Sequence, residues 1–264
     1  MNVAVAYLRR DFLIWSSYRL AAFWQVAGVF TMIALIYFTG TAISGRSDLV
    51  KEQDGDYVAF VFLGLAFMDV FMQGLAALSR AINDNQRAGT LEPMLLAPIR
   101  ETHLMGSLWL FRFVFSMFRM SVFVLFGTLA LGYWHSANPL AIAAVFVPAL
   151  ITFVAMGAFS AAFMLLVKQG DPVLIAFTAM TAVLGGALFP VDALPGWIQP
   201  FAQLVPLTPA LSGIRSGFDG ASVADVAPQI GVLSLMAAVL LPPAVYAFRW
   251  SLNRAKREGS LGEY

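Results

Sequence analysis

This 264-residue chain contains no cysteine, which excludes disulfide bonds and thiolate metal sites within it. Histidine is almost as scarce, because only His103 and His135 occur and they fall in separate segments. A metal centre or an acid–base centre would therefore have few side chains to draw on. Only 12% of the residues are charged, against about 25% in an ordinary soluble domain. The net charge of +1 gives no overall field that would attract nucleic acid.

The sequence also lacks the usual patterns for binding nucleotides and for hydrolysis. Only three lysines occur, and none follows the GxxxxG spacing of a phosphate-binding loop, so we do not expect the chain to bind ATP through such a loop. There is no HExxH motif, and neither histidine is placed to activate the serines that lie within apolar runs. We therefore assign no catalytic, cofactor-binding or metal-ligating residue, and the sequence disfavours an intramembrane enzyme.

Long apolar runs dominate what is present. Hydrophobic residues make up 60% of the chain and the mean hydropathy is +0.78, so lipid is a better solvent for this chain than water. The runs are continuous rather than alternating, which favours helices. Each is long enough to cross about 30 Å of hydrocarbon at about 1.5 Å per residue. The six predicted spans are residues 20–43, 57–78, 104–131, 139–167, 173–189 and 230–248.

Residues 1–19 precede the first span and form an amphipathic pattern. Leu8, Phe12 and Trp15 follow one another at near-helical spacing, and charged residues such as Arg9 interrupt them. This pattern predicts a helix that lies in the headgroup region of the bilayer. A solvated helix that leads into the first span is the alternative.

The distribution of Lys and Arg sets the expected orientation. With the N-terminus placed inside, the cytoplasmic segments hold eleven of these residues and the outer loops three, whereas the outer loops carry seven acidic residues. Both termini are then cytoplasmic. We therefore expect an all-α integral membrane protein with one transmembrane domain over residues 1–264, built from six transmembrane helices and an N-terminal interfacial helix.

The outer segment of residues 193–219, between the fifth and sixth spans, is not a simple loop. Its apolar residues recur at helical spacing on both sides of a break at Pro206 and Pro209, and Pro195 suits the start of the first helix. The pattern predicts two short amphipathic helices on the outer face. They either dip into the outer leaflet as a re-entrant hairpin or lie flat on it.

Three charged residues fall inside predicted spans. Asp69 lies midway along the second span, and Arg112 and Arg119 lie two helical turns apart in the third. Each would cost about 2.5–3.5 kcal/mol at mid-membrane if unpaired. We therefore hypothesise an ion pair between Asp69 and one of the arginines, which either fixes the helix register or lines a polar substrate path. Arg112 could instead snorkel to the inner headgroups.

A polar segment of residues 80–102 separates the second and third spans on the expected cytoplasmic side. It contains Gly89-Thr90-Leu91-Glu92, with Pro98 six residues beyond. Further along are Gly186-Ala187-Leu188-Phe189-Pro190-Val191-Asp192-Ala193-Leu194-Pro195 and then Pro206-Leu207-Thr208-Pro209. In these motifs and in its order of spans, nearly the whole chain resembles the type-2 ABC exporter permeases. Residues 83–88 depart from that family, whose members often carry more acidic residues there, and the Glu-Ala-Ala signature of import permeases is not visible.

The resemblance implies a half-transporter in the bacterial inner membrane. Two permease subunits would pair, with a homodimer expected, and a separate P-loop ATPase subunit would hold the ATP and Mg²⁺. The cytoplasmic segment would serve as the coupling loop, a short helix that sits in a cleft on the ATPase. A solvated connector capped by Asn83 or Asp84 is the alternative. The expected ATPase-contacting residues are Asn83, Asp84, Asn85, Gln86, Arg87, Gly89, Thr90 and Glu92.

The substrate is the least determined feature. The family exports polysaccharides, lipid-linked glycans, lipids and drugs, and the aromatic-rich spans of this chain suit an amphipathic molecule of one of these classes. A secondary transporter or a channel that works without an ATPase is the competing function. That class would be expected to show ionisable residues spread through several spans or clear internal repeats, and the sequence shows neither.

Overall fold

The computed structural model describes residues 57–89, 101–130, 136–167 and 172–258, together with single positions between residues 9 and 38. All regular structure in these residues is helical. The single positions near the N-terminus are also helical, and there Ser17 Oγ donates to the carbonyl of Leu13 at 2.7 Å. Most of the predicted interfacial helix and first span lies outside the described residues.

Five helices correspond to the second to sixth predicted spans: α4 (Tyr57–Arg87), α6 (Glu101–Ala130), α7 (Pro139–Val167), α8 (Pro172–Leu184) and α11 (Ala227–Glu258). Of the described helices, α4, α7 and α11 are long and apolar enough to cross a membrane, and α8 is a shorter apolar helix. The chain is therefore an all-helical membrane protein in its described part.

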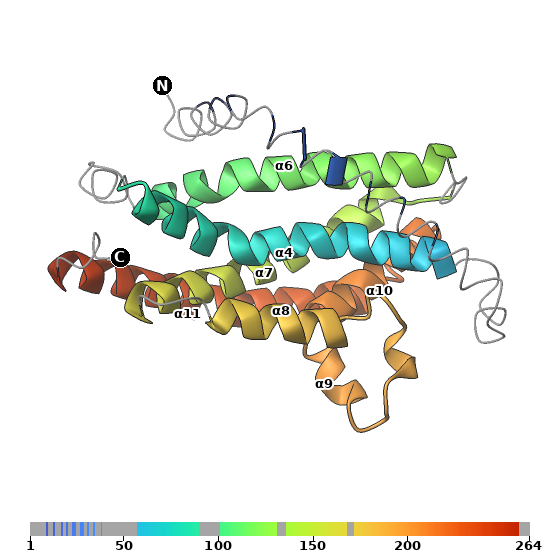
Figure 1. Ribbon diagram of the computed structural model, residues 1–264. Coiled ribbons are helices and arrows are strands. Elements are labelled where there is room, and N and C mark those ends of the chain that lie inside the picture. The colour runs from blue at the N-terminus through green and yellow to red at the C-terminus, as the bar shows by residue number, and fades with distance from the viewer. Residues whose placement is uncertain are drawn as a thin grey trace.

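The long helices lie side by side, with α7 at the centre. It packs against α11 on one side and α4 on the other, while α6 lies along α4 (Figure 1). The Arg87 end of α4 and the C-terminal end of α11 lie at the same end of the bundle, and α10 (Leu207–Phe218) lies toward the opposite end. The bundle thus has two distinct ends, which is the arrangement that a transmembrane domain requires.

Helix α4 is longer than the sequence predicted. The apolar run ends near residue 78, but the helix continues to Arg87 because backbone hydrogen bonding does not depend on apolar side chains. Asn85 supports the extension, since its side-chain amide donates to the carbonyl of Ala81 at 2.7 Å. The helix stops at Gly89, whose φ of 65° is the left-handed conformation that glycine adopts at helix ends.

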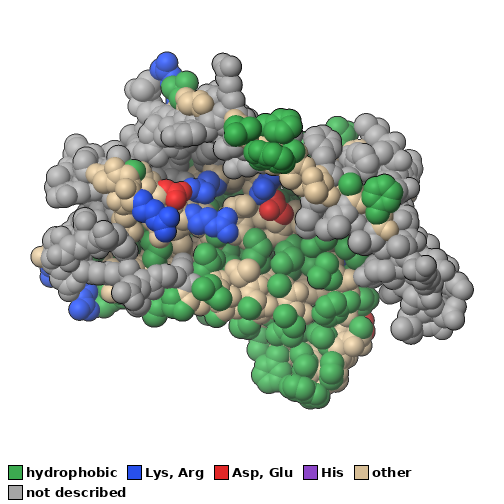
Figure 2. Space-filling model, viewed as in Figure 1, with side chains coloured by type: hydrophobic (Ala, Val, Ile, Leu, Met, Phe, Trp, Pro, Cys, Tyr) green, Lys and Arg blue, Asp and Glu red, His purple; other side chains and the backbone are tan. Residues whose placement is uncertain are grey.

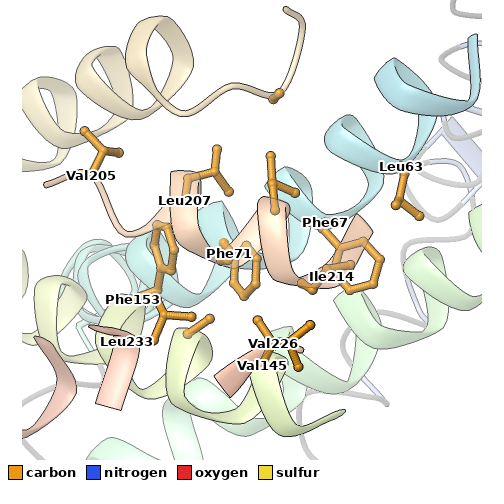
Figure 3. Packing of buried hydrophobic residues seen from close by; sticks show 14 of the residues in the cluster. Leu63, Phe67, Phe71, Val145, Phe153, Val205, Leu207, Ile214, Val226 and Leu233 are labelled. Carbon is orange, nitrogen blue, oxygen red and sulfur yellow. The ribbon is translucent and has the colours of Figure 1, made fainter. Parts of the chain in front are cut away.

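The main hydrophobic core lies where α4, α7, α10 and α11 meet. Phe71 of α4 stacks on Phe153 of α7 with ring centroids 4.9 Å apart and an interplanar angle of 13°. Ile214 of α10 and Leu233 of α11 belong to the same buried cluster (Figure 3). Because α10 contributes to this core, it is fixed to three of the long helices.

Small residues let α4 and α7 approach each other closely toward the Arg87 end of α4. A Cβ atom on Gly157 would lie 2.5 Å from the carbonyl oxygen of Leu75, so only glycine fits there. The hydroxyls of Ser79 and Ser160 lie 2.9 Å apart in a buried hydrogen bond. Such small-residue contacts with an interhelical hydrogen bond are typical of helix packing in lipid, where hydrophobic burial gives little drive for association.

The segment between α8 and α11 contains a 3-10 turn (Val191–Ala193) and the helices α9 (Gln199–Gln203) and α10. The predicted position of the break was partly wrong. Pro206 caps α10, but Pro209 lies within its first turn, where the backbone N–H that proline lacks has no helical partner. The first helix also begins at Gln199 rather than at Pro195. Helix α10 is largely buried against the long helices, whereas α9 exposes Phe201.

Candidate functional site

The polar end of α4 carries most of the residues that the sequence singled out for contact with an ATPase. Asn83, Asp84, Asn85, Gln86 and Arg87 form the last turns of the membrane-crossing helix itself. Asp84 and Arg87 are exposed there, and the other three are half-buried. Neither Asn83 nor Asp84 caps a separate helix, since both lie inside α4. Any force applied to these side chains acts directly on α4.

The polar end closes with a short turn. The N–H of Ala88 donates to the carbonyl of Asp84 at 3.0 Å, and the N–H of Gly89 donates to the carbonyl of Gln86 at 2.9 Å. Space around Gly89 is open, because a Cβ atom there would meet no atom within 4 Å. Only its positive φ therefore demands glycine. Thr90 and Glu92 lie outside the described residues.

Two ion pairs join α4 to α6. Arg119 Nη2 lies 2.7 Å and 2.9 Å from the two carboxylate oxygens of Asp69, and these side chains are 20% and 33% exposed. The Arg119 guanidinium also lies 5.6 Å from the ring centroid of Phe115. Arg112 forms its own ion pair with Asp84. Basic and acidic side chains meet along this face of the molecule (Figure 2).

The sequence left open which arginine pairs with Asp69, and the structure shows that it is Arg119. Asp69 lies 18 residues before the end of α4 at Arg87, and Arg119 lies 18 residues after the start of α6 at Glu101. The two residues are therefore level in an antiparallel pair. Counting from the ends of the apolar runs would instead place Arg112 nearest the level of Asp69, but those are not the ends of the helices. Arg112, nearer the start of α6, reaches the carboxylate at the polar end of α4.

Arg215 of α10 was not singled out by the sequence, yet it connects three elements at the end of the bundle opposite Arg87. Its Nη1 donates to the carbonyl of Gly186 at 2.9 Å, and its Nη2 donates to the carbonyls of Phe60 at 3.1 Å and Ala187 at 3.4 Å. The guanidinium carbon lies 3.4 Å from the ring centroid of Phe60. We call these contacts the Arg215 clamp, because they hold α10 and the segment after α8 against α4.

Glycines make room for the clamp. A Cβ atom on Gly64 of α4 would lie 2.3 Å from the carbonyl oxygen of Ala187 and 2.7 Å from Arg215 Nη2. Gly186 itself has a φ of 68°, which turns the chain sharply after α8. Burial lowers the pKa of Arg215 to about 9, although Asp219 opposes the shift. The guanidinium is therefore still protonated at neutral pH.

The sequence offered only an ambiguous signal for this clamp. Asp219 follows Arg215 by four residues, which reads equally well as an exposed helical ion pair. The pair Gly185-Gly186 marks a turn but does not reveal which side chain satisfies its carbonyls. The contact with Phe60 joins residues far apart in the chain, and no local pattern encodes it.

An apolar cavity of about 500 Å³ lies between α7, α8, α11 and the start of α10. Among the described lining residues, Thr181 has the one side-chain hydroxyl, and that hydroxyl donates to the carbonyl of Phe177 at 2.7 Å. The cavity therefore offers hydrocarbon contacts rather than side-chain hydrogen bonds. Its aromatic and sulfur-containing lining residues are Met156, Phe159, Phe163, Phe177, Met180 and Met236.

The profile of the ABC-2 type transporter family matches residues 4–218, which covers most of the chain. No curated protein matches the chain significantly. The match includes α4, α6, α7, α8 and α10, and so covers the ion pairs and the Arg215 clamp. The chain belongs to the ABC-2 type transporter family and is the non-catalytic membrane component of an ABC transporter, a family whose members work with an ATP-binding subunit.

Proposed function

We propose that this chain is the permease half of an ATP-driven exporter in the bacterial inner membrane. Two copies, paired as a homodimer, form a path for an amphipathic substrate: a lipid-linked glycan, a polysaccharide, a lipid or a drug. A separate P-loop ATPase binds ATP and Mg²⁺ and supplies the force. The membership in the ABC-2 type transporter family supports the general scheme. The direction of transport and the substrate classes rest on the sequence motifs.

We further propose six spans with both termini in the cytoplasm. The charge at the two ends of the bundle supports this orientation. The polar end of α4 carries Arg80 and Arg87, and the adjacent end of α11 carries Arg249, Arg254 and Arg257 (Figure 1). The opposite end, around α10, carries the acidic residues Asp192, Asp219 and Asp225.

The continuity of α4 is the observation that carries the coupling proposal. The helix has 31 residues, which corresponds to about 46 Å at about 1.5 Å per residue. One end presents the polar residues proposed to meet the ATPase, and the other end is held by the Arg215 clamp. A push on the cytoplasmic end would therefore move α4 as a rigid body together with α10 and the outer segment.

The contact with the ATPase is proposed to involve Asn83, Asp84, Asn85, Gln86, Arg87, Gly89, Thr90 and Glu92. Arg112 takes part indirectly, because its ion pair with Asp84 makes α6 move with α4. The pair of Asp69 with Arg119 adds a second link between the same helices. These links favour a role of the intramembrane charges in fixing the α4–α6 register over a role in lining a substrate path.

The apolar cavity supports an amphipathic substrate. Its volume of about 500 Å³ lies within the range of about 300–1,000 Å³ that is common for ligand pockets. Its hydrocarbon lining suits an acyl or prenyl chain or an apolar drug, and leaves a polar head group to other parts of the path.

Replacing Gly89 by valine is expected to lower transport-coupled ATP hydrolysis severalfold. A β-branched residue disfavours the left-handed conformation at this position by about 1–2 kcal/mol, so the chain would leave α4 in a different direction. Hydrolysis by the reconstituted permease–ATPase complex measures the effect. Gly89→Asn is the matched control, because asparagine tolerates a positive φ, and it is expected to retain most activity. Equal activity of both variants would contradict a role of this turn in coupling.

The competing function, transport without an ATPase, is tested with the permease reconstituted in lipid vesicles. We expect no uphill movement of substrate when the permease is reconstituted alone, and export when the ATPase and ATP are added. ATP-independent export by the permease alone would overturn the proposed function.

A further inference from the structure

A hollow of about 550 Å³ lies beside the C-terminal end of α11. It is distinct from the apolar cavity, because basic and aromatic side chains line it and no carboxylate does among the described residues. The described lining residues are Tyr246, Arg249, Trp250, Asn253, Arg254 and Arg257.

These residues form one stripe along α11, which we call the arginine stripe. Their spacing of three or four residues places them on the same helix face. The other face of this part of α11 is buried, where Phe248 and Leu252 pack with residues of α4 and α7. The arginine stripe therefore faces away from the bundle, and Tyr246 and Trp250 on it are 73% and 48% exposed.

The charge of the stripe suits an anion. Arg249, Arg254 and Arg257 bring positive charge to the C-terminal end of the helix, which itself carries a partial negative charge of about half an electron. The Arg254 guanidinium lies 5.6 Å from the ring centroid of Trp250, so an arginine and an aromatic ring border the same hollow. Arginine presents several N–H donors in a planar fork that matches phosphate oxygens.

The depth of the stripe suits a lipid headgroup. The apolar run of α11 ends at Phe248, and Arg249 to Arg254 then covers about 7.5 Å along the helix at about 1.5 Å per residue. The headgroup layer on each side of a bilayer is about 5–8 Å thick. Tyr246 and Trp250 are the residue types that lie at this boundary. The guanidinium groups are thus placed at the level of lipid phosphates.

We propose that the arginine stripe binds the phosphate of an anionic phospholipid. The lipid belongs to the leaflet that faces the ATPase, so the choice of leaflet rests on the orientation in the proposed function. The binding itself requires only the permease. A site of this kind would fix the end of α11 at a constant depth while α4 moves.

Binding of fluorescent phosphatidylglycerol to the purified full-length permease in neutral detergent tests the proposal. The double variant Arg249→Gln/Arg254→Gln is expected to bind this lipid about tenfold more weakly, because it loses two of the cations that attract the lipid phosphate. Fluorescent phosphatidylcholine is expected to bind weakly to both proteins. The exposed Arg80→Gln on α4 removes a charge at the same end of the bundle, and it is expected to leave the affinity unchanged.

Three results would overturn the proposal. One is unchanged phosphatidylglycerol affinity in the double variant. Another is an equal loss in Arg80→Gln, which would indicate a general charge effect. The last is competition by inorganic phosphate or glycerol phosphate at the concentration at which the lipid competes, which would indicate a soluble anion. The assay contains no ATPase, so its failure leaves the coupling proposal untouched.

Discussion

An Arg215→Leu variant is expected to yield at least tenfold less folded, monodisperse protein than the wild type. Arg215 donates to the carbonyls of Gly186, Phe60 and Ala187, and leucine can donate to none of them. Hydrogen bonds from a charged group contribute about 1.5–3 kcal/mol each, and buried carbonyls left without partners add their desolvation cost. The loss is therefore large compared with a marginal folding stability of about 5–15 kcal/mol.

The measurement is the monodisperse peak in size-exclusion chromatography together with the midpoint of thermal unfolding in detergent. Arg80→Leu is the matched control, since it makes the same substitution at an exposed arginine of α4. It is expected to fold nearly as the wild type does. Arg215→Lys keeps the charge but loses the planar fork, so an intermediate yield is expected. A yield of Arg215→Leu equal to that of Arg80→Leu would show that the clamp does not stabilise the end of the bundle around α10.

The Arg215 clamp also bears on transport, because it is the point where α4 meets the segment between α8 and α11. A variant that still folds but has a weaker clamp, such as Arg215→Lys, separates the two roles. If the clamp transmits movement, this variant hydrolyses ATP normally but exports less substrate per ATP. If the clamp is only structural, hydrolysis and export fall together with the amount of folded protein.

The helices of the described part could be predicted well from sequence, because their signal is local. Lipid leaves backbone groups no partner outside the chain, so a long apolar run between polar segments has to be helical. The predicted spans from residue 57 onward each overlap a helix of the structure. The helix ends could not be predicted in the same way. Hydropathy marks where lipid ends, whereas the backbone of α4 continues through polar residues until Gly89 turns it.

The contacts of the site were harder to predict, since they depend on register between distant segments. That Asp69 needs a cationic partner follows from the cost of an unpaired charge in lipid, and α6 supplied two arginines. Which arginine pairs depends on the true helix ends. Those ends do not coincide with the ends of the apolar runs, so the sequence left both arginines as candidates. The Arg215 clamp needs three segments placed together in space, so sequence patterns alone could not reveal it.

Reversing the Asp69–Arg119 pair is expected to restore assembly that either single reversal destroys. Asp69→Arg places two guanidinium groups together between α4 and α6, and Arg119→Asp places two carboxylates there. Removing one partner of a fully buried pair costs about 3–5 kcal/mol, and this pair, with side chains 20% and 33% exposed, approaches that case. Each single variant should therefore give at least tenfold less folded protein. The double variant Asp69→Arg/Arg119→Asp re-forms the pair with its ends exchanged and should recover to within about threefold of the wild type, measured as the monodisperse fraction.

The second ion pair supplies the contrast that makes this test specific. Asp69→Arg combined with Arg112→Asp should not recover, because Arg112 pairs with Asp84. Asp84→Arg alone should have a mild effect, since the Asp84 side chain is 62% exposed and exposed ion pairs contribute about 0.2–1 kcal/mol. Recovery with Arg112→Asp but not with Arg119→Asp would mean that α6 lies about two turns away from the register described here. Arg112 would then be level with Asp69, and the proposed link from the polar end of α4 to α6 would be lost.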